Sequence, residues 1–453
     1  MIMPLLPAAL CTLLAAGPEV TPITPASQPA LALSTRLRYP ATEQLEGNAA
    51  IGWNQVVTAA SWNADLNTQI DTILATPFDQ FDTTLANRIL SDNVYDTLAS
   101  FITIAARRDS CDWQSPFREQ GLGTLLPELG RHRTLARLLR LRARTALHNN
   151  DFPGALAAIR NGLELAHDYS DSKSAIQALV GAAIASSMLD ELEVLASRPG
   201  APSLYWSLAD LPRPFFSIST LLLYEEAMID FTLPIFREIE TLPIDDERAV
   251  SLAAKANRDL ASMLQSPTSS ASGDIATAAR VIAAYPAAKA WMISTGLAPD
   301  RVAALPVSYV VIRHELVQYR LHSDQLFRWL NLPYPEAEAG LEAFLADRAT
   351  HPVSNDSLGS WLPSLDKVFG ALWNLERRFA VLRATEAIRL HLGSTNALPT
   401  SLDAIIIVPV PRDPITGEPF RFRLDGDTAV ISGPPIQFLT NPAPLEHRVR
   451  IAR

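Results

Sequence analysis

Residues 143–166 read ARTALHNNDFPGALAAIRNGLELA, two helical segments joined by a short turn. Asp151 precedes Phe152, Pro153 and Gly154, an order typical of a helix start, because the carboxylate accepts free backbone N–H groups and a first-turn proline needs no acceptor. Ile159, Leu163 and Ala166 then recur at helical spacing. This stretch predicts an antiparallel helical hairpin.

The helical spacing of apolar residues continues over most of residues 40–394. The segment from Ala175 to Leu189 is almost wholly apolar and lies between Lys173 and Asp190, so we expect a buried central helix rather than a membrane span. No second copy of the hairpin follows at the ~34-residue period of a regular solenoid. An irregular array of helical hairpins is therefore expected.

The period changes after Ala404. Phe420, Phe422 and Leu424 alternate with arginines, and Asp425-Gly426 suits a tight hairpin turn. Returning strands are expected over 428–432 and 447–451. The fold class is therefore mainly α, with a small C-terminal antiparallel β-meander.

Composition limits the functions to be considered. Among the 453 residues, 48% are hydrophobic and 19% are charged, which suits a folded protein with ample core. The net charge of −10 argues against nucleic acid as a partner, because phosphate binding needs a concentrated basic surface. Four lysines stand beside 34 arginines, so an arginine cluster alone is weak evidence for a binding site.

The first residues are similar to the apolar part of a secretory signal. An apolar run covers 1–16, the proline-rich segment 18–29 follows, and the first basic residue is Arg36. We therefore expect export to the periplasm or cell envelope, with an apolar leader on a cytoplasmic protein as the alternative. Removal of this segment would take Cys11 and leave Cys111 without a disulfide partner. No apolar run reaches the length of a membrane-spanning helix, so none is expected in the mature chain.

The sequence predicts six consecutive segments. They are a signal-like segment (1–17), a proline-rich linker (18–38), a helical domain (39–265), a flexible linker (266–273), a second helical part packing on the first (274–394), and a loop and β-meander module (395–453).

Patterns associated with catalysis are incomplete in this chain. Ser364 and Lys367 fit a Ser-x-x-Lys motif, but the Lys-Thr-Gly element that accompanies it in penicillin-recognising enzymes is missing. The histidines form no His-Glu-x-x-His set. Asp413, Asp425 and Asp427 could collect a hard cation, yet each also fits a turn. We therefore predict no catalytic, cofactor-binding or metal-ligating residues.

Two groups of residues are candidates for an interaction surface. Arginines at steps of four, three and four form one stripe on a helix, which is either a partner-binding face or a solvated face paired with local acids. A second group combines acids with aromatic side chains that could line a pocket, or simply bury a helix end. The stripe is Arg133, Arg137, Arg140 and Arg144, and the second group is Asp109, Asp112, Trp113, Tyr205 and Trp206.

Three resemblances accompany these patterns. The hairpin around Asp151-Phe152 and Ala155 resembles a tetratricopeptide unit. Several segments, taken in order, are similar to uncharacterised exported helical proteins of planctomycete-type bacteria, and that resemblance implies an exported helical architecture with no assigned activity. The C-terminal module resembles the globular part of type II secretion pseudopilins. The segments similar to the exported proteins are 46–50, 106–113, 137–144, 202–214 and the terminal module, and the pseudopilin-like positions are 398–400 and 411–414.

Together these observations favour a non-enzymatic interaction or scaffold protein with a protein partner in the cell envelope, because helical arrays present extended binding surfaces. The alternatives are a hydrolase-type enzyme with an unrecognised site near 107–113 and an accessory of a secretion apparatus.

Overall fold

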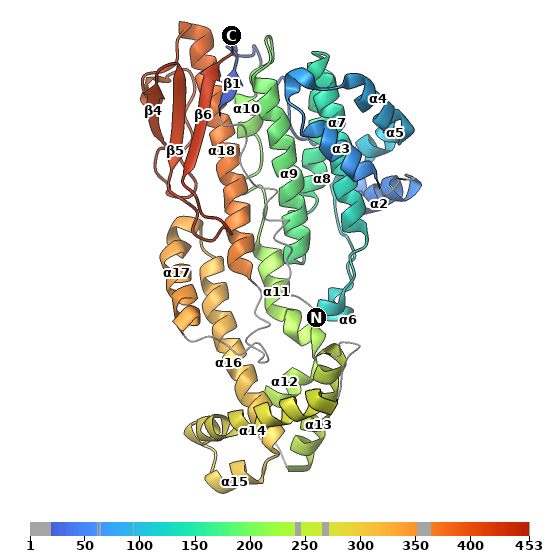
Figure 1. Cartoon of the computed structure of the whole chain (residues 1–453), viewed down its shortest axis with the longest axis vertical. Coiled ribbons are helices and arrows are strands. Elements are labelled where there is room, and N and C mark those ends of the chain that lie inside the picture. Colours follow the sequence, from blue (N-terminus) through green and yellow to red (C-terminus); the bar gives the residue numbers. More distant parts are fainter. Residues whose placement is uncertain are drawn as a thin grey trace. The chain divides into compact units, whose positions relative to one another are not determined.

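The structure is a computed structural model that describes residues 20–452 except 61, 63, 64, 94, 241–245, 265–270 and 351–363. It divides into two compact units, each made of segments that are separate in the sequence. The larger unit contains the described residues up to 114, then 126–221 and 365–452. The smaller unit contains 115–125 and the described residues from 222 to 364 (Figure 1).

Four long helices form the centre of the larger unit: α7 (Glu128–His148), α8 (Phe152–His167), α9 (Ala175–Ala196) and α18 (Leu365–Thr395). Each packs on the next in this order (Figure 1). The hairpin predicted from the sequence is the α7–α8 pair. Asn150 adopts a left-handed conformation with φ of 57°, and the Asp151 carboxylate accepts the Gly154 N–H at 2.9 Å. Most residues of α9 are buried, as its sequence predicts.

Shorter elements precede this centre. Helices α2 (Ala49–Ala59), α3 (Leu66–Leu74), α4 (Thr83–Asp92) and α5 (Tyr95–Ala106) pack on one another and on α7 and α8 (Figure 1). The strands β2 (Leu45–Asn48) and β3 (Arg108–Ser110) form a short parallel pair beside them. The Gly47 N–H donates to the Asp109 carboxylate at 3.0 Å and fixes this pair.

A four-stranded sheet packs on α18 at the C-terminal end. Its order is β1 (Thr21–Ile23), β6 (Leu445–Ile451), β5 (Thr428–Gly433) and β4 (Arg421–Asp425), with Gly426 at the β4–β5 turn (Figure 1). The three C-terminal strands are antiparallel, as expected, whereas β1 pairs parallel with β6. Residues 21–23 thus form a strand within the segment expected to be a linker.

A buried ion pair inside α18 anchors the segments around it. Arg389 pairs with Glu386 at 2.6 Å, and both side chains are almost fully buried. The Arg389 Nε donates to the Thr24 carbonyl at 2.9 Å, and Glu386 accepts the Leu204 N–H at 2.9 Å. These bonds hold the N-terminal strand segment and the turn before α10 (Tyr205–Ala209) against α18.

The smaller unit is helical throughout its regular structure. Its central helix is α16 (Val307–Leu330), against which α12 (Ile235–Glu240), α13 (Asp246–Leu264), α14 (Ala271–Ser294) and α17 (Tyr334–Thr350) pack. Buried Arg313 donates to the Ile239 carbonyl at 2.7 Å, which satisfies an acceptor that the end of α12 leaves free. The remaining helices are α6 (Phe117–Gln120), α11 (Ser219–Thr232) and α15 (Pro299–Ala304).

The structure confirms the predicted fold class, which is mainly helical with a small C-terminal sheet. The two discontinuous units differ from the consecutive segments expected from the sequence, because α18 returns to the helices of residues 128–196. The predicted signal-like segment and residues 266–270 of the predicted linker lie outside the described residues, and α14 begins at Ala271.

Candidate functional site

The arginine stripe on α7 faces two other helices of the larger unit. Arg137 pairs with Asp71 of α3 at 2.9 Å, and Arg140 pairs with Glu191 of α9 at 2.8 Å. Arg144 also pairs with Glu191, at 2.6 Å. Burial and the neighbouring charge of Arg137 lower the pKa of Arg133. Three of the four arginines are therefore engaged by acids of this chain.

The stripe becomes more buried toward the end of α7. At Arg137 the partner Asp71 is 56% exposed, whereas at Arg144 the partner Glu191 is 0% exposed. Arg378 of α18 extends the network, since it pairs with Asp190 of α9 at 2.7 Å. The network thus joins α3, α7, α9 and α18, and its charges are largely paired.

Asp109 and Asp112 stabilise the loop around β3. Asp109 accepts the Gly47 N–H, and the Asp112 carboxylate accepts from the Gln114 N–H at 3.0 Å and from Lys173 at 3.2 Å. The bond from Gln114 is the main reason that the pKa of Asp112 is lowered. Both acids shape the backbone that leads to Trp113.

Half-buried Trp113 packs on buried Tyr169 and His132 in an aromatic cluster beside the end of α8. Its ring stacks on Tyr169 with centroids 4.4 Å apart, and its Nε1 donates to the Asp168 carbonyl at 2.9 Å. His132 joins them, with its Nδ1 2.6 Å from the Tyr169 hydroxyl. Burial lowers the pKa of His132 to about 4, so this imidazole is neutral at pH 7.

Two acidic groups beside this cluster have raised pKa values. Burial raises the pKa of Asp168 well above its usual range, although the carboxyl accepts the Trp53 Nε1–H at 2.5 Å. Burial likewise raises the pKa of the Cys111 thiol. A reactive cysteine needs an electropositive, accessible setting that favours the thiolate, so this environment has the properties of a structural thiol.

Tyr205 and Trp206 lie in the core of the C-terminal module rather than beside Trp113. Tyr205 is buried among residues of α18 and the sheet, and its hydroxyl donates to the Pro409 carbonyl. Trp206 packs edge-on against Tyr205 with ring centroids 5.0 Å apart. The two halves of the expected aromatic group therefore occupy separate clusters.

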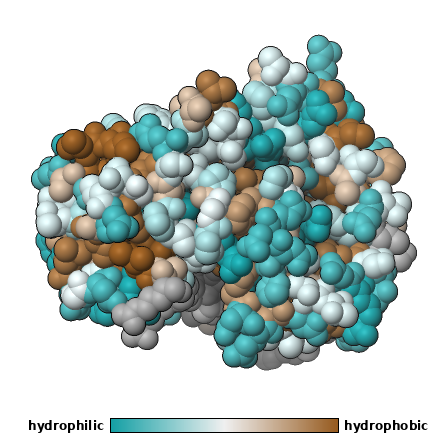
Figure 2. Space-filling view, turned by 90° about the horizontal axis from the view of Figure 1, so that it is seen from above, coloured by the Kyte–Doolittle hydropathy of each residue, from teal (hydrophilic) through white to brown (hydrophobic). Residues whose placement is uncertain are grey.

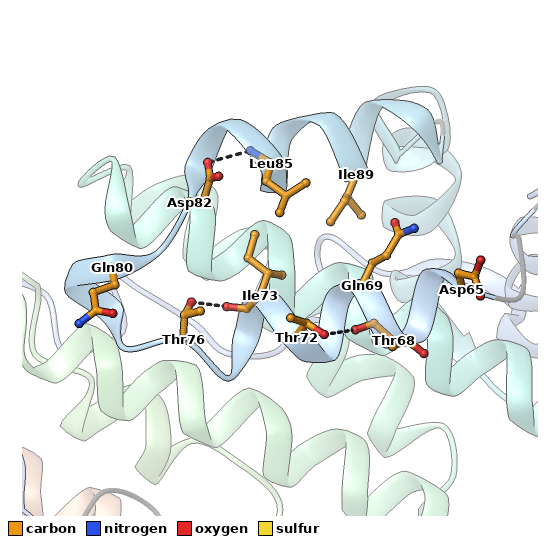
Figure 3. A pocket seen from close by; sticks show the side chains of 10 residues that line it. All are labelled: Asp65, Thr68, Gln69, Thr72, Ile73, Thr76, Gln80, Asp82, Leu85 and Ile89. Carbon is orange, nitrogen blue, oxygen red and sulfur yellow. Dashed lines mark hydrogen bonds between the residues drawn. The ribbon is translucent and has the colours of Figure 1, made fainter.

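A groove between α3 and α4 is the candidate binding site. Its cavity is about 500 Å³. The side chains of Leu85 and Ile89 point from α4 toward Ile73 and Gln69 on α3, while Asp65 and Gln80 lie toward its two ends (Figure 3). The remaining lining residues are Thr68, Thr72, Thr76 and Asp82.

Three polar side chains of the groove, those of Thr72, Thr76 and Asp82, keep hydrogen-bond acceptor capacity. The Thr72 and Thr76 hydroxyls donate to helix carbonyls at 2.7 and 2.6 Å, so their lone pairs remain free to accept. Asp82 uses one carboxylate oxygen to cap α4 through the N–H groups of Thr84 and Leu85. The groove is therefore suited to a ligand that donates hydrogen bonds.

The sequence pattern of residues 65–89 does not distinguish this groove from an ordinary exposed helix face. The lining residues on and beside α3 recur at steps of three, one, three and four, which is one face of a helix; they are Asp65, Thr68, Gln69, Thr72 and Thr76. A polar face on a short helix has the same pattern as ordinary solvent exposure. Charge is the sequence signal that could have indicated the groove, since residues 65–92 contain five aspartates and one arginine.

Comparison with known protein families, with curated proteins and with solved structures finds no match to this chain. By its fold, the protein is a helical array with a C-terminal β-sheet module. In the described part of the chain, no helix combines the length and hydrophobicity needed to cross a membrane. Nor do three histidine, cysteine or carboxylate side chains of these residues group as metal ligands.

Proposed function

We propose that this protein is a non-enzymatic interaction protein whose α3–α4 groove holds a segment of a protein partner. The observation that carries the proposal is the groove itself, which has an aliphatic floor from two helices and a polar rim (Figure 3). Peptide-binding helical proteins use this combination, with apolar anchors for affinity and polar groups for orientation.

The charge of the groove indicates the chemistry of the partner segment. Asp65 and Asp82 lie on its lining, none of the described residues that line it is basic, and the α3–α4 hairpin is acidic overall. A segment with aliphatic side chains flanked by lysine or arginine would fill the floor and pair with the rim. Such complementarity chiefly sets the association rate and the choice of partner.

The arginine stripe supports this proposal by positioning α3. Arg137 pairs with Asp71, and Thr134 of α7 donates to Asn67 of α3 at 2.9 Å. Asn67 and Asp71 lie outside the groove lining. The bonds therefore hold one wall of the groove without occupying it, and a preformed groove loses less conformational entropy on binding.

The location of the protein is part of the same proposal. The apolar run at 1–16, followed by proline-rich sequence, supports export and a partner in the periplasm or cell envelope. Sequencing the N-terminus of protein isolated from its host tests this. Loss of the apolar run is the expected result, and an intact Met1 on cytoplasmic protein would contradict it.

One observation favours a second candidate, an accessory of a secretion apparatus. The end of α18 leads through Pro399 to a turn at 411–414 and then to an antiparallel meander, the order seen in the pseudopilin-like module. Exposed apolar side chains of this module include Ile406, which is 93% exposed. Figure 2 shows several hydrophobic patches on one face of the molecule, with the larger ones at the left of the view.

Site-specific photocrosslinking tests the groove. A crosslinking side chain at Thr72, which lines the groove, should attach to one partner in the native host, and mass spectrometry should map the adduct to a basic segment. The matched control is exposed Asn87 on α4, which does not line the groove. Equal crosslinking from Thr72 and Asn87, or none from Thr72, would contradict the proposal.

A further inference from the structure

An arginine of α18 has no counter-ion in the described structure. Arg383 is half-buried, and its guanidinium carbon lies 5.9 Å from the centre of the Tyr205 ring. Its Nε is buried without a hydrogen-bond partner among the described residues. A buried donor without an acceptor is costly, so such a group either stores strain or awaits a ligand.

A second arginine reaches the same short helix. Arg213 follows α10 and donates to the carbonyl of Ala209, the last residue of that helix, at 3.1 Å. Arg383 stacks on Tyr205, the first residue of α10. After burial, the charge of Arg213 is the next cause of the lowered pKa of Arg383, which agrees with two cations placed close together.

Two acids on or next to α10 and α18 are engaged elsewhere. Asp210 pairs with Arg36 at 2.7 Å. Glu376 accepts the Phe215 N–H at 2.5 Å, and burial raises the pKa of this carboxyl to about 7, so it is only a partial negative charge near neutrality. Neither carboxyl provides Arg383 with a hydrogen-bond acceptor within the described residues.

We propose that Arg383 and Arg213 bind an oxyanion, a phosphate or carboxylate group of a small molecule, beside Tyr205. The planar fork of a guanidinium matches both groups through paired hydrogen bonds. The ligand would supply the ion-pair partner that the half-buried Arg383 side chain lacks among the described residues, and it would offset the repulsion between the two cations. This site lies on α10 and α18, so it does not depend on the proposed α3–α4 groove.

Calorimetric titration of the full chain tests this site. Inorganic phosphate and malonate are titrated separately, with chloride at matched ionic strength as the reference. Saturable binding of either oxyanion is expected, and whichever binds identifies the ligand group as phosphate or carboxylate. Arg383→Gln should weaken that binding about tenfold or more, because it removes a charge-assisted pair.

Two further variants keep the test decisive. Arg213→Gln changes an exposed side chain, so it can replace Arg383→Gln if that variant does not fold, and it should also weaken oxyanion binding. Arg412→Gln is the matched control, because Arg412 is 65% exposed and its acidic partner is exposed Glu418. Absence of saturable oxyanion binding would overturn the proposal. Binding that is unchanged in both Arg383→Gln and Arg213→Gln would do the same.

Discussion

At the scale of single residues, the C-terminal module depends on a buried charge pair. Arg377 and Asp413 lie 2.5 Å apart and are 3% and 1% exposed. Asp413 also accepts the Ile415 N–H at 3.0 Å, so this carboxylate shapes the turn at 411–414 while it pairs with α18. Gly433 makes this approach feasible, since a Cβ there would lie 2.1 Å from Arg377 Nη2. Asp413, one of the three aspartates that could have collected a cation, therefore already has Arg377 and the Ile415 N–H as partners.

Asp413→Ala should strongly destabilise the module. It leaves Arg377 buried without its carboxylate, a change that typically costs about 3–5 kcal/mol. Urea unfolding and hydrogen exchange of β4–β6 measure the effect. Glu418→Ala removes the exposed partner of Arg412 and should cost at most about 1 kcal/mol. Similar effects for the two variants would show that the buried pair has no special role.

Glu376 should make stability depend on pH. Burial raises its folded-state pKa from 4.5 to about 7, so folding favours the protonated carboxyl. This stabilisation is complete below pH 4.5 and is lost as pH rises through 7. Glu376→Gln keeps an acceptor for the Phe215 N–H and cannot ionise.

The free energy of unfolding of the Glu376→Gln variant should therefore equal that of the wild-type protein near pH 4.5. At pH 8 it should be higher than that of the wild-type protein, by at most about 3 kcal/mol. Denaturant unfolding at both pH values measures the difference. A difference that does not change between them would contradict the raised pKa.

At the scale of elements, local sequence signals predict the helices and the meander, but not their partners. Asp151 and Pro153 mark the start of α8 because capping is a property of adjacent residues. By contrast, β1 is three residues long, and its partner β6 lies at the other end of the chain. The contact of Trp113 with Tyr169, and the acids that pair with the arginine stripe, likewise depend on tertiary packing. The sequence shows that the four arginines share one face of a helix, but it does not show how deeply each of them is buried.

The two ends of the stripe should respond differently to loss of their acids. Glu191→Ala leaves Arg144 buried without a carboxylate and should cost about 3–5 kcal/mol, with faster hydrogen exchange in α7 and α9. Asp71→Ala removes a partner that is 56% exposed, and it should cost about 1 kcal/mol or less. If Asp71→Ala were the more damaging change, the network would not be organised by burial.

At the scale of the whole molecule, the larger unit combines a rigid helical centre with a groove on a peripheral hairpin. The charged network that joins α7, α9 and α18 also reaches α3 through Arg137 and Asp71. This arrangement can present a preformed binding groove, because the α3 wall is held by bonds from α7 that the ligand does not use. The central claim is thus that binding of a basic partner segment depends on the lining of the α3–α4 groove.

Quantitative capture of the proposed protein partner from the native host tests that claim most directly. Thr72→Arg places a bulky positive charge in the groove, where it would repel a basic segment, and Asn87→Arg adds the same charge outside the groove. The account predicts that Thr72→Arg abolishes capture of the partner mapped by photocrosslinking, whereas Asn87→Arg retains it. Full capture by a folded Thr72→Arg variant would contradict the account.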